Sequence, residues 1–138
     1  SMALHQKGGR LARFLSRMVW KRNCKLSACQ LSPEAVVGDG LYLPHALGIV
    51  IGHGVIIGKD VRILQHVTIG RRNEMDERCP EIKDGVIIFI NSSILGPITV
   101  GEKAIVAAHS LVMKDVAPET VVAGNPQQVI QRKSDKKS

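Results

Sequence analysis

An aliphatic residue recurs at every sixth position through most of this chain, and this repeat restricts the fold more than any other feature. A period of six fits neither the 3.6-residue period of an α-helix nor simple strand alternation. It indicates a β-solenoid, in which each hexad forms one short strand and one bend, with the aliphatic side chain pointing to the axis. The thirteen positions are Leu31, Val37, Leu43, Ile51, Ile57, Ile63, Ile69, Ile82, Ile88, Ile94, Val100, Val106 and Val112.

The repeat is interrupted twice. Two extra residues follow Leu43, where Pro44 and His45 stand, and a longer insertion reads RRNEMDERCPE at residues 71–81. A solenoid does not need such interruptions for its stability, and loops on a rigid scaffold often carry function. Both interruptions are therefore the first places to look for a site.

Four stretches carry a resemblance to a known family. The segments LPHALGIVIG, ILQHVTIG, RCPEI and VVAGNP resemble the catalytic domain of serine acetyltransferases and related sugar O-acetyltransferases, within the hexapeptide-repeat acyltransferase family. The resemblance covers about residues 30–130. It implies an all-β fold, a left-handed parallel β-helix built as a prism of three flat sheets. It also implies a homotrimer with active sites between subunits. A β-sandwich of short strands is the alternative, and hexads in register disfavour it.

His45 is the predicted catalytic residue. The resemblance places the family's catalytic histidine there, and the chemistry suits an imidazole. Transfer of an acetyl group from acetyl-CoA, the implied co-substrate, to a hydroxyl requires removal of the hydroxyl proton. Imidazole titrates near neutral pH, so it can accept that proton and later return one to the leaving thiolate.

The acceptor is expected to meet Arg78, Cys79, Gln30 and Gln65. Arg78 matches an arginine of the serine enzymes and could pair with a carboxylate, or it could be a solvated loop charge. Cys79 stands where those enzymes have a histidine, or it is a small buried apolar residue. Gln30 stands where they have the aspartate that orients the base, so Gln30, Gln65 or a main-chain carbonyl must take that role.

Acetyl-CoA is expected along the C-terminal coils. By resemblance, Ile90 and Ala108 fall at small cofactor-contacting positions, and Lys114 could meet a phosphate or be a plain surface charge. No metal is expected, because the histidines lack the spacing of β-helical metalloenzymes.

Pro44 is a third departure, because serine acetyltransferases have an aspartate just before the catalytic histidine. The departures at Pro44, Gln30 and Cys79 favour a sugar hydroxyl of a cell-surface polysaccharide pathway as the acceptor. The first alternative is a serine O-acetyltransferase of cysteine biosynthesis. The second is a non-catalytic β-helix scaffold. The sequence does not identify the particular sugar, because no simple rule relates the sequence of an acceptor-binding loop to the sugar that it binds.

The basic residues lie at the two ends of the chain. Residues 2–25 hold seven basic residues and no acidic one, residues 132–138 carry a net +3, and residues 26–131 a net −3. This charge distribution and the small number of aromatic residues argue against a nucleic-acid groove.

Residues 1–27 are predicted to form a basic amphipathic helix that either caps the solenoid or contacts an anionic membrane surface. Residues 28–130 then form the β-helix, and residues 131–138 form a basic tail. The expected location is cytoplasmic, or at the inner face of the membrane.

Overall fold

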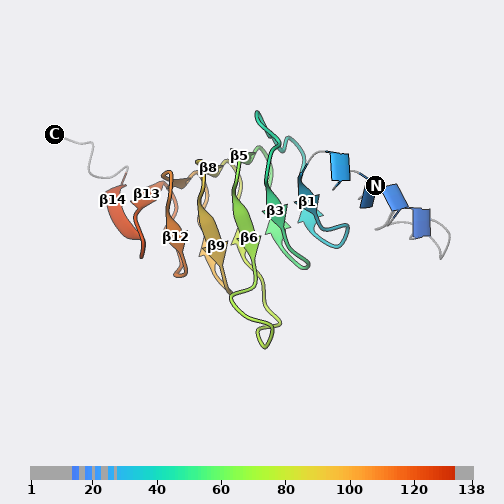
Figure 1. Ribbon diagram of the computed structural model, residues 1–138. Coiled ribbons are helices and arrows are strands. Elements are labelled where there is room, and N and C mark those ends of the chain that lie inside the picture. Colours follow the sequence, from blue (N-terminus) through green and yellow to red (C-terminus); the bar gives the residue numbers. More distant parts are fainter. Residues whose placement is uncertain (1–13, 16–17, 20, 23–24, 27, 133–138) are drawn as a thin grey trace.

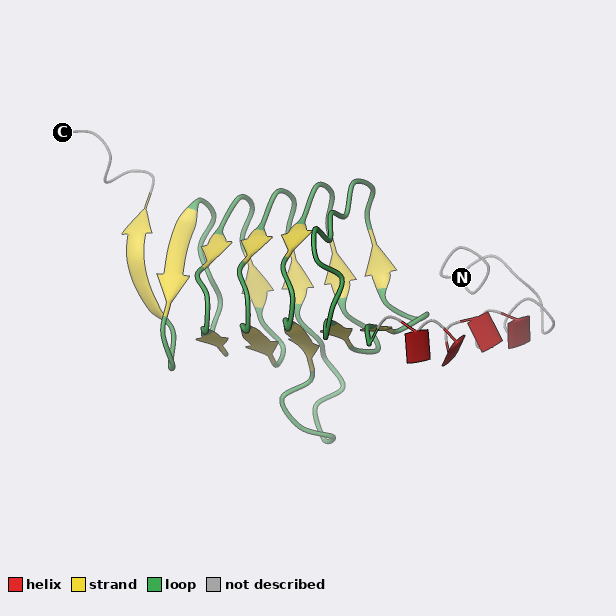
Figure 2. Ribbon diagram, turned by 45° about the horizontal axis from the view of Figure 1, so that its top comes forward, coloured by secondary structure: helices red, strands yellow, loops and turns green. Residues whose placement is uncertain are grey.

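The computed structural model describes residues 14–15, 18–19, 21–22, 25–26 and 28–132. Its strands form three sheets, seen as three rows in Figures 1 and 2. Sheet A contains β1 (Gln30–Leu31), β3 (Val50–Ile51), β6 (Thr68–Gly70), β9 (Ser93–Leu95) and β12 (Leu111–Val112). Sheet B contains β2 (Val36–Val37), β4 (Ile56–Ile57), β7 (Glu81–Ile82) and β10 (Thr99–Val100). Sheet C contains β5 (Arg62–Ile63), β8 (Ile87–Ile88), β11 (Ile105–Val106), β13 (Thr120–Ala123) and β14 (Gln128–Arg132).

The strands pair in parallel from one coil to the next, so the chain forms a parallel β-helix, as the repeat predicts. Ile51 pairs with Ile69, eighteen residues later. Gln30 pairs with Val50 at a separation of twenty, and Ile57 pairs with Ile82 at twenty-five. The two longer separations show that the insertions add residues at corners without disturbing the register of the sheets.

The hexad aliphatics form the core. From Ile51 to Val112 all ten have at most 1% of their surface exposed. Leu31, Val37 and Leu43 are only partly buried and pack against this core. They belong to the first coil, which has a neighbouring coil on one side only among the described residues. Each buried Ile or Val stabilises the stack by about 1.5–3 kcal/mol, so stacking alone can hold a chain with few aromatic residues.

Glycine is needed where one turn lies directly on the next. A Cβ placed at Gly101 would lie 2.8 Å from the carbonyl carbon of Ala117. Real Cβ atoms are not found so close to backbone atoms, so any larger residue here would push two coils apart.

Two features lie outside the repeat. β13 and β14 pair antiparallel and end the prism with a hairpin, which the sequence analysis does not predict. The expected N-terminal helix falls mostly outside the described residues. The described residues within it have helical backbone and exposed side chains. In the part of the chain that the structure describes, no helix is both long and apolar enough to span a bilayer.

Candidate active site

His45 lies in the corner that leads from sheet C to sheet A, called here the C–A corner. In each coil this corner turns through one left-handed residue, namely Gly48, His66, Asn91 and His109 in successive coils. The two extra residues of the first interruption lie just before Gly48, so His45 projects from an otherwise regular turn. Its side chain is exposed, and its carbonyl oxygen accepts a hydrogen bond from the Leu47 N–H at 2.8 Å.

A column of side chains runs along this corner from the His45 coil toward the C-terminus. The His66 N–H donates to the Leu47 carbonyl (2.9 Å), the Asn91 N–H to that of Gln65 (3.2 Å), and the His109 N–H to that of Ile90 (2.9 Å). These bonds stack one turn on the next. Four residues therefore form what we call the corner stripe: Leu47, Gln65, Ile90 and Ala108. The stripe brings three of the predicted site residues into line with the His45 turn.

Gln65 carries an unsatisfied group. Its side-chain Oε1 is buried and has no hydrogen-bond partner among the described residues. A buried acceptor without a donor costs free energy, typically about 1–3 kcal/mol. The amide is therefore available to a donor that enters from the corner. A direct bond from Gln65 to the His45 ring is not present in the described structure.

Three polar residues that the sequence does not mark as site residues lie beside the stripe. His66, Asn91 and His109 have φ of 57°, 56° and 58°, a region that asparagine tolerates better than most residues. The His66 ring lies directly over Gly48, which also has a positive φ of 62° and no room for a Cβ. The sequence does contain a signal for these turn positions, because each of the three residues immediately precedes an inward-pointing residue of a hexad.

Arg78 and Cys79 lie at a different corner. The loop between β6 and β7 projects from the prism (Figure 1) and returns at the corner between sheets A and B. There the Cys79 thiol donates to the His53 carbonyl at 2.9 Å, and Nδ1 of His53 lies 2.6 Å from Oε2 of Glu34. Arg78 is exposed, and its backbone N–H donates to Asp76 Oδ1. Cys79 is partly buried, so it can still contact a molecule at the corner.

The chain therefore brings together only some of the predicted site residues. His45 and the A–B corner lie at opposite edges of sheet A, because β3 runs between His45 and His53. Gln30 lies on the outer face of β1, beside Val50, and makes no hydrogen bond to the His45 ring in the described structure. Lys114 lies after β12, at the A–B corner, where its backbone N–H and carbonyl both bind the Gln127 side chain.

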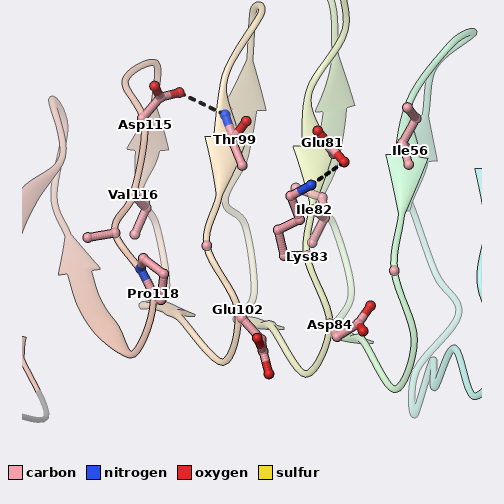
Figure 3. A pocket seen from close by; sticks show the side chains of 13 residues that line it. Ile56, Glu81, Ile82, Lys83, Asp84, Thr99, Glu102, Asp115, Val116 and Pro118 are labelled. Atoms are coloured by element: carbon pink, nitrogen blue, oxygen red, sulfur yellow. Dashed lines mark hydrogen bonds and ion pairs between the residues drawn. The ribbon is translucent and has the colours of Figure 1, made fainter.

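A groove with a volume of about 850 Å³ runs over sheet B, away from the C–A corner (Figure 3). Its carboxylates, including Glu81 and Glu102, would repel the phosphates of a nucleotide-like cofactor. Among the described residues, no group of three or more His, Cys, Asp and Glu side chains is placed to hold a metal ion.

Comparison with known proteins points to one family. The chain is 39% identical over 145 residues to serine acetyltransferase 2 of Arabidopsis thaliana, an alignment that covers 94% of this chain and 45% of the plant protein. The solved structure of soybean serine acetyltransferase apoenzyme superimposes with a TM-score of 0.82 at 39% identity, over 86% of this chain and 50% of that one. This chain belongs to the hexapeptide-repeat acyltransferase family. Further support comes from the serine acetyltransferase of Mycobacterium tuberculosis, 38% identical over 92% of this chain and 55% of that protein.

Within the hexapeptide-repeat family, the similarity is to serine acetyltransferases. A structure from Brucella abortus has a TM-score of 0.85 at 32% identity and covers 95% of this chain and 52% of that one. No family model matches the chain. The chain spans about half the length of the serine acetyltransferases it matches.

The preference for a sugar acceptor is therefore wrong, because the relatives are named as serine acetyltransferases. It rested on three departures from the serine-specific pattern, at Gln30, Pro44 and Cys79. The similarity of the whole prism to serine acetyltransferases holds in spite of these three substitutions. Because the chain spans about half the length of its relatives, it gives no information on domains outside the matched part. Nothing in these comparisons supports a polysaccharide pathway.

Proposed function

We propose that this chain transfers the acetyl group of acetyl-CoA to the hydroxyl of serine, with His45 as the general base. The observation that carries the proposal is the C–A corner, where the exposed His45 lies two residues before Leu47, the first residue of the corner stripe. The choice of serine as the acceptor comes from the serine acetyltransferases at about 40% identity, and one solved structure is soybean serine acetyltransferase complexed with serine.

The reaction follows from the position of the imidazole. The ring of His45 removes the proton from the serine hydroxyl as its oxygen attacks the thioester carbonyl carbon. The carbon–sulfur bond then breaks, and the CoA thiolate takes up the proton from His45. The products are O-acetylserine and free CoA. A positioned base of this kind typically contributes a rate factor of about 10²–10⁴.

Acetyl-CoA fits the corner stripe better than the sheet B groove. The stripe presents the exposed Ala108 and the partly buried Ile90, apolar surfaces that suit the pantetheine arm. Gln65 Oε1 can accept a hydrogen bond from an N–H of that arm or of the acceptor. Lys114 lies at another corner of the same chain, so contact between Lys114 and the cofactor would require a neighbouring chain.

We also propose that the protein works as a homotrimer of left-handed prisms. Within one chain, His45 lies across sheet A from Arg78 and Cys79. A neighbouring prism can supply the loop between β6 and β7 from its own A–B corner and complete the acceptor pocket. A cyclic arrangement then gives three equivalent sites. Light scattering tests this, and a fully active monomer at micromolar concentration contradicts it.

The decisive experiment for function measures the release of CoA thiol with serine and with other hydroxyl compounds as acceptors. We expect turnover with serine to exceed turnover with threonine and with simple sugars. A sugar used as well as serine would overturn the proposed acceptor. If calorimetry detects no CoA binding at all, the chain is a scaffold and not an enzyme.

The N-terminal segment and the cellular location stay predictions. Residues 2–25 carry seven basic residues, a charge that suits an anionic lipid surface. Sedimentation with liposomes, with and without anionic lipid, distinguishes membrane contact from a role as a cap. The absence of binding at low salt would remove the membrane proposal.

A further inference from the structure

The outer face of sheet B carries an open groove that the acetyl-transfer reaction does not use. β4, β7, β10 and residues 115–118 line it (Figure 3). Apolar surface comes from Ile56, Val116 and Pro118. The lining residues include four carboxylates and one ammonium group, a formal net charge of −3. These are Glu81, Asp84, Glu102, Asp115 and Lys83.

Two of the carboxylates are held in place by the backbone. Asp84 Oδ1 accepts the Lys59 N–H at 2.7 Å, and Asp115 Oδ1 accepts the Thr99 N–H at 2.8 Å. Neutral donors orient these groups and leave their negative charge uncancelled. Glu81 pairs with Lys83, and Glu102 lies 3.6 Å from the exposed Lys103 ammonium. The groove therefore presents a fixed negative charge to the solvent.

The described chain ends beside this groove. β14 returns antiparallel to β13 and places Arg132 opposite Thr120. The Thr120 hydroxyl donates to the Pro118 carbonyl at 3.1 Å, and Pro118 lines the groove. The residues that follow Arg132 therefore start at the C-terminal end of the groove.

Those residues have the charge and length to fill it. Residues 133–138 read KSDKKS, with three lysines, one aspartate and a net +2. Six extended residues reach about 20 Å. The groove spans four coils, and three spacings of about 4.8 Å amount to roughly 14 Å. We propose that the lysine-rich tail, residues 133–138, docks into the sheet B groove of its own chain. The proposal rests on the charge of the groove and the position of the chain end, and it uses no observation from the C–A corner.

Zero-length carbodiimide cross-linking of the full chain tests the proposal. The reagent joins a lysine amine to a carboxylate that it touches, and mass spectrometry locates the bond. We expect Lys136 and Lys137 to link to Asp84, Glu102 or Asp115 at low ionic strength. The yield should fall strongly in 0.5 M salt, because exposed ion pairs are screened there. Refolding a mixture of ¹⁵N-labelled and unlabelled chains shows whether each link lies within one chain.

A pair of variants separates groove charge from overall charge. Glu81→Gln with Glu102→Gln removes two groove charges and leaves the backbone bonds of Asp84 and Asp115 intact. We expect links to those two aspartates to fall about fivefold, since each exposed ion pair typically shifts an equilibrium by a few-fold. The control, Glu74→Gln with Glu77→Gln, removes the same charge from the exposed loop and should change nothing.

Three results would overturn the proposal. The tail lysines could link equally to carboxylates all over the surface, which would show no preference for the groove. The links could join different chains, which would make a second copy the source of the tail. Lysines of residues 7–25 could link in place of the tail lysines, which would make the N-terminal segment the occupant.

Discussion

Adjacent isoleucines in β4 allow a direct test of the inward and outward faces of the prism. Ile57 has 1% of its surface exposed, whereas Ile56 has 43% exposed on the outer face of sheet B. Replacing Ile57 with alanine removes three buried carbon groups at about 0.8 kcal/mol each, or about 2.4 kcal/mol. The cavity left between Val37 and Ile82, its partners in the ladder, raises the loss to about 3–4 kcal/mol. The same change at Ile56 should cost less than about 1 kcal/mol.

Urea unfolding followed by far-UV circular dichroism measures the difference. With a slope of about 2 kcal/mol per M, the midpoint should fall by about 1.5–2 M for Ile57→Ala and by less than about 0.5 M for Ile56→Ala. All samples need the same protein concentration, because association would shift the midpoint. Equal losses at the two positions, or a larger loss at Ile56, would show that the assigned faces of β4 are reversed.

Three further predictions concern the site and the turns. His45→Ala should lower turnover by a factor of about 10²–10⁴ with CoA affinity nearly unchanged, while the turnover of His66→Ala should stay within a few-fold of the parent. Thiol-release assays measure turnover and calorimetry measures CoA affinity; a larger loss of turnover for His66→Ala than for His45→Ala would move the base to His66. Gly101→Ala should destabilise the prism by a few kcal/mol in thermal unfolding, because its Cβ would meet the next coil, whereas Gly70→Ala, with nothing within 4 Å of its Cβ, should be tolerated; similar melting temperatures would contradict this. Cys79→Ala should raise the acceptor Michaelis constant more than it lowers turnover, which steady-state kinetics with varied serine will show; a loss confined to turnover would remove Cys79 from the acceptor pocket.

The sequence was most informative where the repeat is strictest. The hexads from Ile51 to Ile69 correctly predict which side chains are buried, because each inward side chain packs on the equivalent side chain of the next coil. The positions of the two insertions were also readable, because they break that spacing. The β13–β14 hairpin was not readable, since its pairing is antiparallel and follows no hexad.

The choice of acceptor shows a different limit. Pro44, Gln30 and Cys79 depart from the serine-specific pattern, and these departures favoured a sugar acceptor. Similarity over the whole prism reversed that preference. Three single positions weigh less than the similarity of an entire scaffold, because each can change without altering the fold.

The sequence by itself determined the solenoid, its core and the corner from which His45 projects. These three features follow from the local pattern, in which one aliphatic side chain in every six residues is buried away from water. Only the tertiary structure decided which distant residues meet. It stacked Leu47, Gln65, Ile90 and Ala108 into one stripe, and it left Arg78, Cys79 and Lys114 at another corner. The physical reason is that the two insertions add residues at corners while the sheets keep their register, so the separation of two residues in the sequence does not tell which of them stack.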